Sequence, residues 1–142
     1  MSSGRLLRFG TRKRVGVIPY FSLAAGFLTG KYRSQQDTEK AAGGALVQKY
    51  LNDWGFGVVA VLNEVANAHG STPARVALAW LLAQPGITAP IASATNERQL
   101  ADLVEAAKLK LPAESIQKLN MASSRKVVAE RYGQVGKCCF WH

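Results

Sequence analysis

The chain has 142 residues, of which 48% are hydrophobic and 19% charged, a composition that excludes a disordered chain and fits one globular domain. No run of about 18 apolar residues exists, which excludes a membrane-spanning helix. The net charge is +9, but most of the excess lies in residues 1–14 and 124–142. Because a nucleic-acid-binding domain carries its basic residues on the folded body, we interpret these flanks as solvated tails rather than phosphate-tracking arms.

Residues 1–14 contain five basic residues and no acid, without an apolar stretch behind them. They make a poor secretory signal, so we expect a cytoplasmic protein, with an organellar presequence as the lesser alternative. The adjacent Cys138 and Cys139 cannot link distant parts of the chain through a disulfide between them. Together with His142 they match no zinc-ligand spacing, so we predict no metal site.

Two short apolar runs read as buried strands. Residues 15–20 are rich in β-branched side chains on both faces, as in a parallel sheet, and residues 87–92 form a second such run. Residues 22–30 read as a small-residue loop, and residues 34–47 as a polar surface loop.

Four helices are expected from apolar spacing and cap signals. The first covers about 56–68 and ends at Gly70. The second starts at Pro73 behind the N-cap Thr72, and the other two cover about 96–107 and 112–122. The side chains expected to face the core are Val58, Val61, Leu62, Val65, Ala66, Val76, Ala77, Trp80, Leu81, Leu100, Leu103, Val104, Ile116 and Leu119. Strands alternating with helices predict an α/β fold with parallel strands.

Each predicted strand is followed by a loop with anion-binding features. The first loop, residues 22–33, combines small residues with Lys31 and Arg33, which can neutralise phosphate. The second, residues 93–99, opens a helix whose free amides favour an anion, and Arg98 adds charge. Helix capping by Thr95 and Asn96 explains part of the second loop equally well. Together the loops predict a phosphate-bearing ligand bound across both.

Three segments resemble one known family. Residues 17–33 look like the seventh strand and following loop of aldo-keto reductases, residues 69–86 like the seventh helix region, and residues 89–100 like the eighth strand and cofactor loop. The resemblance covers residues 15–123, which divides the chain into a basic flank (1–14), a partial barrel with the seventh and eighth strand–helix units, and a tail (124–142) outside the family pattern.

The resemblance implies the C-terminal portion of a TIM barrel, with about two parallel strands and four helices, that binds NADP(H). It places four residues along the pyrophosphate: Ser22, Leu23, Gly26 and Lys31. Five more lie near the 2′-phosphate and adenine: Ala94, Thr95, Asn96, Arg98 and Gln99. The chain departs from many members at Leu23, where they have Pro, at Ser93, where they have Gly, and at Leu103, where they have an Asn that meets the adenine.

The family reduces aldehydes and ketones with a Tyr proton donor assisted by Lys, Asp and His, which come from the first four strands. No residue of this chain matches that motif, so none is assigned a catalytic role. We therefore expect a reductase-like fragment that keeps the cofactor-binding end and associates with the complementary barrel half or with itself. The alternative is a non-catalytic nucleotide-binding or protein-interaction module. We expect no nucleic-acid and no membrane partner, and a basic nucleic-acid-associated protein is the least favoured reading.

Overall fold

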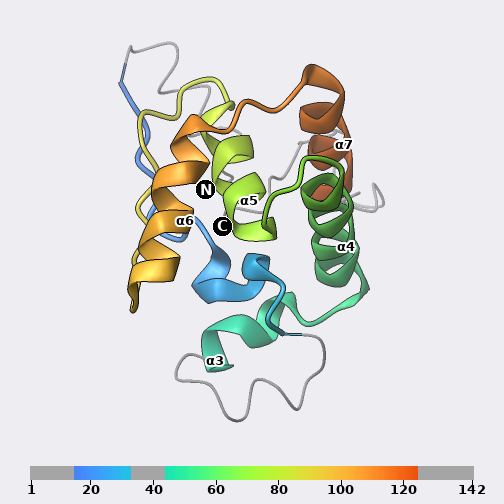
Figure 1. Ribbon diagram of the computed structural model, residues 1–142. Helices are drawn as coiled ribbons and strands as arrows, with labels where there is room; N and C mark the ends of the chain where they lie inside the picture. The colour runs from blue at the N-terminus through green and yellow to red at the C-terminus, as the bar shows by residue number, and fades with distance from the viewer. Residues whose placement is uncertain (1–14, 33–43, 125–142) are drawn as a thin grey trace.

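The computed structural model describes residues 15–32 and 44–124. Its elements in chain order are the 3-10 helix η1 (Ala24–Thr29), α3 (Gly44–Val47), the 3-10 helix η2 (Gln48–Tyr50), α4 (Asp53–Ala68), α5 (Pro73–Leu82), α6 (Glu97–Lys108) and α7 (Ala113–Ser123). Figure 1 shows α5 between α6 and α4, with α7 packed along α4. The four helices expected from the sequence are confirmed, and their ends differ by a few residues from the prediction.

Side-chain caps explain where α4 and α5 begin. The Asn52 side chain accepts a hydrogen bond from the Gly55 N–H at 3.0 Å, so α4 starts at Asp53 rather than near residue 56 as predicted. The Thr72 hydroxyl accepts the Arg75 N–H at 3.3 Å at the start of α5, as expected. Each cap satisfies an amide that has no partner within its own helix.

The end of α4 is fixed by backbone hydrogen bonds around Gly70. The Ser71 N–H donates to the Ala66 carbonyl at 2.8 Å, and the Gly70 N–H donates to the Asn67 carbonyl at 3.3 Å. Gly70 has a φ of 56°, a left-handed conformation that glycine adopts without the strain of a side chain. Gly70 ends the helix as predicted, in the position directly after the C-cap His69, and the chain then leads through Ser71 and Thr72 into α5.

The two predicted strands meet in one parallel bridge only. Val17 pairs with Ile87, and its N–H and carbonyl each make a 2.9 Å bond to a residue flanking Ile87. Residues 15–20 and 87–92 thus run side by side in the same direction at this point. Within the described residues no strand longer than this bridge is formed, so the two-strand prediction is not confirmed.

Two prolines explain why the ladder stops. In a regular parallel ladder the next two hydrogen bonds would use the N–H groups of residues 19 and 90 as donors. Both positions are proline, which has no N–H. The Pro19 carbonyl instead accepts the Ile91 N–H at 3.0 Å, which shifts the pairing by one residue. The segments therefore stay adjacent at residues 19 and 91 without forming regular strands.

Two expected loops carry short helices. Residues 22–30 contain η1, whose Phe27 and Leu28 are completely buried. Of the predicted loop 34–47, residues 44–47 form α3, and the rest lies outside the described residues. The loop prediction was wrong for residues 44–47, where the buried Val47 anchors a helical turn. In η1, Gly26 and Gly30 adopt left-handed conformations with φ of 86° and 77°, so the turn expected at these glycines is present although 3-10 turns lie on either side of Gly26.

Exposed apolar side chains lie on the first bridge segment and on α6. Ile18 is 58% and Tyr20 74% exposed on the first bridge segment. On α6, Leu100 is 56% and Val104 51% exposed, so the prediction that these two face the core was wrong. Helical spacing placed them on one face correctly, but no described element covers that face. Leu103 and Val61 are half-buried, and most of the other predicted core side chains are fully buried.

We expect these exposed apolar side chains to drive self-association of the isolated chain, since each Å² of apolar surface removed from water contributes about 25 cal/mol. Ile18→Lys should shift the sedimentation profile towards the monomer. Met121→Lys is the matched control, because Met121 is also exposed but lies on α7. A wild-type chain that sediments as a monomer and melts cooperatively would contradict this expectation.

Within the described residues, no helix is both long and apolar enough to cross a membrane.

Candidate phosphate-binding loops

Ser22 fixes the start of the first loop through a hydrogen bond to the preceding segment. This residue is buried, and its hydroxyl donates to the Pro19 carbonyl at 3.0 Å. Leu23 is half-buried against the core, and its carbonyl accepts the Gly26 N–H at 2.9 Å. The Ser22 proton and the Gly26 amide are therefore used inside the loop, and both residues shape its backbone.

The turn of this loop is strained. Ala24, Ala25 and Gly26 have successive positive φ values of 49°, 55° and 86°, a region that alanine rarely adopts. Such strain persists only where surrounding packing enforces it, and it concentrates at ligand-binding positions. Here the buried Ala24 and Phe27 anchor the turn in the core.

Lys31 lies across the glycine of this turn. A Cβ on Gly26 would come within 3.0 Å of Lys31 Cε and 3.1 Å of Lys31 Nζ. The Lys31 ammonium also lies 4.8 Å from the ring centroid of Tyr32. The absence of a side chain at Gly26 thus leaves room for the lysine beside the loop backbone. Arg33, the other basic residue expected here, lies outside the described residues.

The second loop is organised by its own side chains. The Asn96 side chain accepts the Gln99 N–H at 2.9 Å and caps α6. The Gln99 side-chain oxygen accepts from the Thr95 N–H at 2.9 Å and from the Thr95 hydroxyl at 3.0 Å. Capping therefore occupies three of the five predicted residues. Ala94 is half-buried, while Arg98 is exposed in the first turn and enters none of the ion pairs found between described residues.

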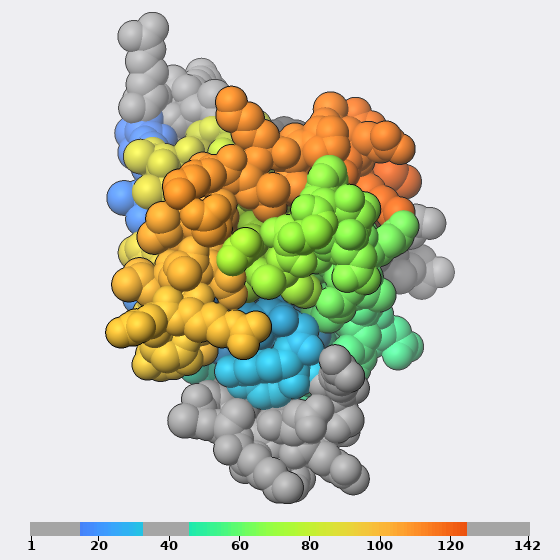
Figure 2. All heavy atoms as spheres, viewed as in Figure 1, coloured from blue at the N-terminus to red at the C-terminus, as the bar shows by residue number. Residues whose placement is uncertain are grey.

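The two loops emerge side by side. The Ile91 to Pro19 hydrogen bond joins the segments three residues before Ser22 and before Ala94. Figure 2 shows both loops reaching the surface in the lower part of the view, where the first turn of α6 lies beside the segment that contains η1. The predicted juxtaposition of two loops at the ends of parallel segments is therefore present. Whether these residues bind phosphate remains a prediction.

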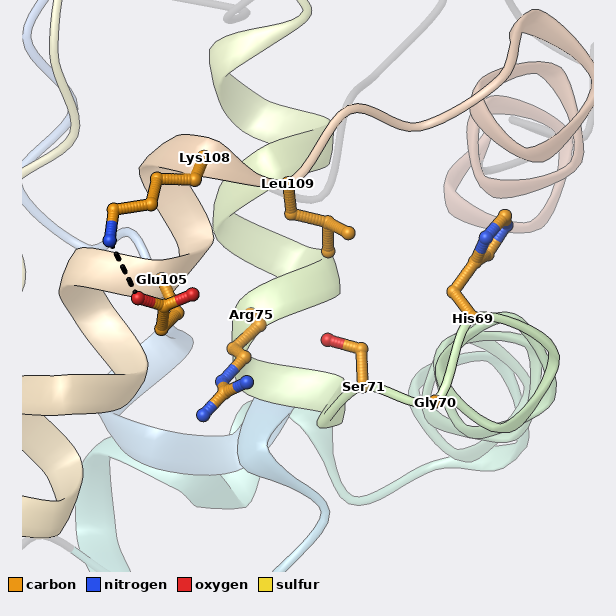
Figure 3. A pocket seen from close by; sticks show the side chains of 7 residues that line it. All are labelled: His69, Gly70, Ser71, Arg75, Glu105, Lys108 and Leu109. Atoms are coloured by element: carbon orange, nitrogen blue, oxygen red, sulfur yellow. Dashed lines mark hydrogen bonds and ion pairs between the residues drawn. The ribbon is translucent and has the colours of Figure 1, made fainter.

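A separate hollow of about 240 Å³ lies where α4 ends and α5 begins beside the last turns of α6 (Figure 3). Its lining residues are His69, Gly70, Ser71, Arg75, Glu105, Lys108 and Leu109. Arg75 pairs with Asp102 at 2.7 Å, and Glu105 pairs with Lys108 at 2.8 Å. The hydrogen bond from Lys108 lowers the pKa of the Glu105 carboxyl below its usual value. The charges that line the hollow are thus already paired, and none of the predicted site residues lies there.

No cluster of three potential metal ligands occurs within the part of the chain that the structure describes. Cys138, Cys139 and His142 lie outside that part.

Sequence reasoning missed Lys49, a further cation beside the first loop. Its Nζ lies 4.9 Å from the Tyr50 ring centroid and 5.9 Å from that of Phe21.

Comparison with known proteins identifies the relatives of the chain. The model of the Aldo/keto reductase family matches residues 2–123. The aldo-keto reductase str7 of Strobilurus tenacellus is 30% identical over 136 residues, which is 92% of this chain and 40% of the relative. The L-glyceraldehyde 3-phosphate reductase of Escherichia coli O157:H7 is 34% identical over 65% of this chain and 28% of the relative.

The name of a third relative states a cofactor, NADP(+). The NADP(+) aldo-keto reductase yakc of Schizosaccharomyces pombe is 28% identical over 83% of this chain and 36% of the relative. The chain therefore spans less than half the length of each of these relatives.

Proposed function

Because the chain belongs to the aldo/keto reductase family, whose fold is a TIM barrel and whose members generally use NADP(H), we propose that its two adjacent loops bind the phosphates of NADP(H). In this proposal the chain supplies the cofactor-binding end of a carbonyl reductase. Its barrel portion is residues 15–123, with the seventh and eighth strand–helix units, flanked by residues 1–14 and 124–142. The proton donor and its partners lie on parts of the barrel that these residues do not include.

The observation that carries the proposal is the juxtaposition of the two loops. The Ile91 N–H to Pro19 carbonyl bond brings their starting points together, so one extended ligand can span both. Sites in α/β barrels are built from such loops at the carboxyl ends of the strands. Lys31 stands on one loop and the exposed Arg98 on the other, as two separate phosphate groups of one ligand require.

The remaining site residues have supporting roles in this proposal. Ser22, Leu23 and Gly26 shape the backbone along which the pyrophosphate lies. Thr95, Asn96 and Gln99 fix the first turn of α6 through their mutual hydrogen bonds, so that its free amides and Arg98 face the 2′-phosphate. Ala94, which is half-buried, allows close approach of the adenosine.

Arg98→Ala should weaken NADP(H) binding by roughly tenfold or more, because a charge-assisted hydrogen bond to phosphate contributes about 1.5–3 kcal/mol. NAD(H) lacks the 2′-phosphate and should be affected much less. Calorimetric titration of both dinucleotides into wild type and variant measures the difference. Arg98→Lys tests whether a point charge suffices in place of the planar guanidinium.

Lys110→Ala is the control for a general loss of positive charge, because Lys110 is exposed in the connection between α6 and α7, away from both loops. Equal weakening of both dinucleotides by Arg98→Ala, or no effect on either, would remove Arg98 from the site. Arg98 would then be a solvated residue in the first turn of a helix. NADP(H) binding without any reductase activity in a complemented barrel would favour the non-catalytic nucleotide-binding module instead.

A further inference from the structure

Two lysines stand beside the strained turn of the first loop, and each is held in the same way. Lys31 lies over the ring of Tyr32 at 4.8 Å, and Lys49 lies over the ring of Tyr50 at 4.9 Å. Both tyrosines are buried, so each ring is a fixed platform on which an exposed ammonium rests. The two cations come from segments before and after residues 33–43, and only Lys31 was expected at the site.

Contacts with the loop fix the position of Lys49. Its ammonium also lies 5.9 Å from the ring of Phe21, the residue that opens the turn by accepting the Ala24 N–H at 3.0 Å. Tyr50 stacks on Phe27 of η1, with ring centroids 5.7 Å apart and an interplanar angle of 23°. The segment that carries Lys49 is therefore packed onto the loop.

We propose that Lys49 is a second cation of the phosphate site and binds the pyrophosphate together with Lys31. The inference rests on the proposed function and deepens it. A pyrophosphate diester carries two negative charges, and Lys31 is the one Lys or Arg within the described residues 22–32 of this loop. Lys49, held at the start of the turn while Lys31 crosses its glycine, supplies the second charge. Phe21 and Tyr50 act as positioning residues for the Lys49 ammonium.

The test compares NADPH with adenosine 2′-monophosphate, which keeps the 2′-phosphate and adenine but has no pyrophosphate. Lys49→Gln should weaken NADPH about three- to tenfold, because one exposed charge-assisted contact is lost. The dissociation constant of adenosine 2′-monophosphate should change by no more than about twofold in the same variant. Lys49→Arg should retain most of the affinity, and Lys110→Gln, with the same charge change at the other end of α6, should bind both ligands as wild type does.

Added salt provides a second readout, since the difference between wild type and Lys49→Gln should shrink as ionic strength rises. Thermal unfolding of Lys49→Gln must match wild type, as expected for an exposed side chain. Unchanged NADPH affinity in Lys49→Gln overturns the inference alone. Equal weakening of both ligands also overturns it, since a direct pyrophosphate contact cannot act on a ligand that has none. Wild type that binds neither ligand refutes the proposed function itself, and the inference with it.

Discussion

Gly55→Ala should destabilise the chain by about 3 kcal/mol or more, at the upper end for an added methyl group in a packed interior. A Cβ at this position would lie 1.9 Å from the Tyr50 carbonyl oxygen and 3.2 Å from the Phe27 ring. The carbonyl cannot easily move, because it accepts the Asn52 N–H at 2.9 Å at the start of α4. The clash is therefore with backbone and must displace either the first turn of α4 or the segment before it.

Gly57→Ala in the same helix is the matched control. Nothing lies within 4 Å of its would-be Cβ, so alanine should stabilise the helix by about 0.5–1 kcal/mol. Urea unfolding followed by circular dichroism gives the free energy of unfolding for both variants. If both substitutions stabilise the chain, helix propensity, and not the close approach of Gly55 to Tyr50, governs this helix.

The helices were predictable because their signals are local. Thr72 before Pro73 and Asn96 before Gln99 mark helix starts within a few residues of sequence, and the structure confirms both caps. The start of α4 was missed because Asp-Trp-Gly after Asn52 does not continue the apolar spacing that begins at Phe56. The cap, rather than the periodicity, decides that boundary.

Features that depend on contacts between distant segments could not be predicted in the same way. Pro19 and Pro90 are visible in the sequence, but that their missing N–H groups fall at the same point of one ladder follows only from the pairing of Val17 with Ile87. Likewise, helical spacing groups Leu100 with Val104 without saying what covers them.

The residues of the candidate site also fall into two groups, those that local sequence predicts and those whose position depends on contacts between distant segments. The loop residues were proposed from charge, small side chains and family resemblance, all of which are read from short segments. Lys49 gave no such signal, because its role depends on the packing of Tyr50 on Phe27, between segments more than twenty residues apart. The repeated Lys-Tyr pair at 31–32 and 49–50 is the only hint in the sequence, and it gains meaning only when both buried rings are seen.

The 142-residue chain by itself should oxidise no NADPH with reactive aldehydes above the blank rate. Carbonyl reduction needs a proton donor near the developing alkoxide, and such a donor contributes about a hundred- to ten-thousandfold to the rate. By resemblance, the donor tyrosine and its lysine, aspartate and histidine partners belong to strands that residues 15–123 do not include. Glu105 does not replace the donor, because a carboxyl with its usual pKa is already ionised at neutral pH, and the hydrogen bond from Lys108 lowers the pKa of Glu105 further.

The tyrosines at positions 20, 32 and 50, which lie in the described part of the chain, suggest how this expectation could be contradicted. Tyr32 and Tyr50 are buried beneath lysine side chains, whereas Tyr20 is 74% exposed on the segment that leads into the first loop. The assay follows NADPH absorbance with three samples, each purified free of host reductases. These are the chain alone, its Tyr20→Phe variant, and the chain co-expressed with a segment that carries the preceding strand–helix units of the barrel. Turnover only with the added segment supports a split between cofactor-binding and catalytic parts. Turnover by the chain alone that disappears in Tyr20→Phe would contradict that split and identify a donor that the family resemblance does not include.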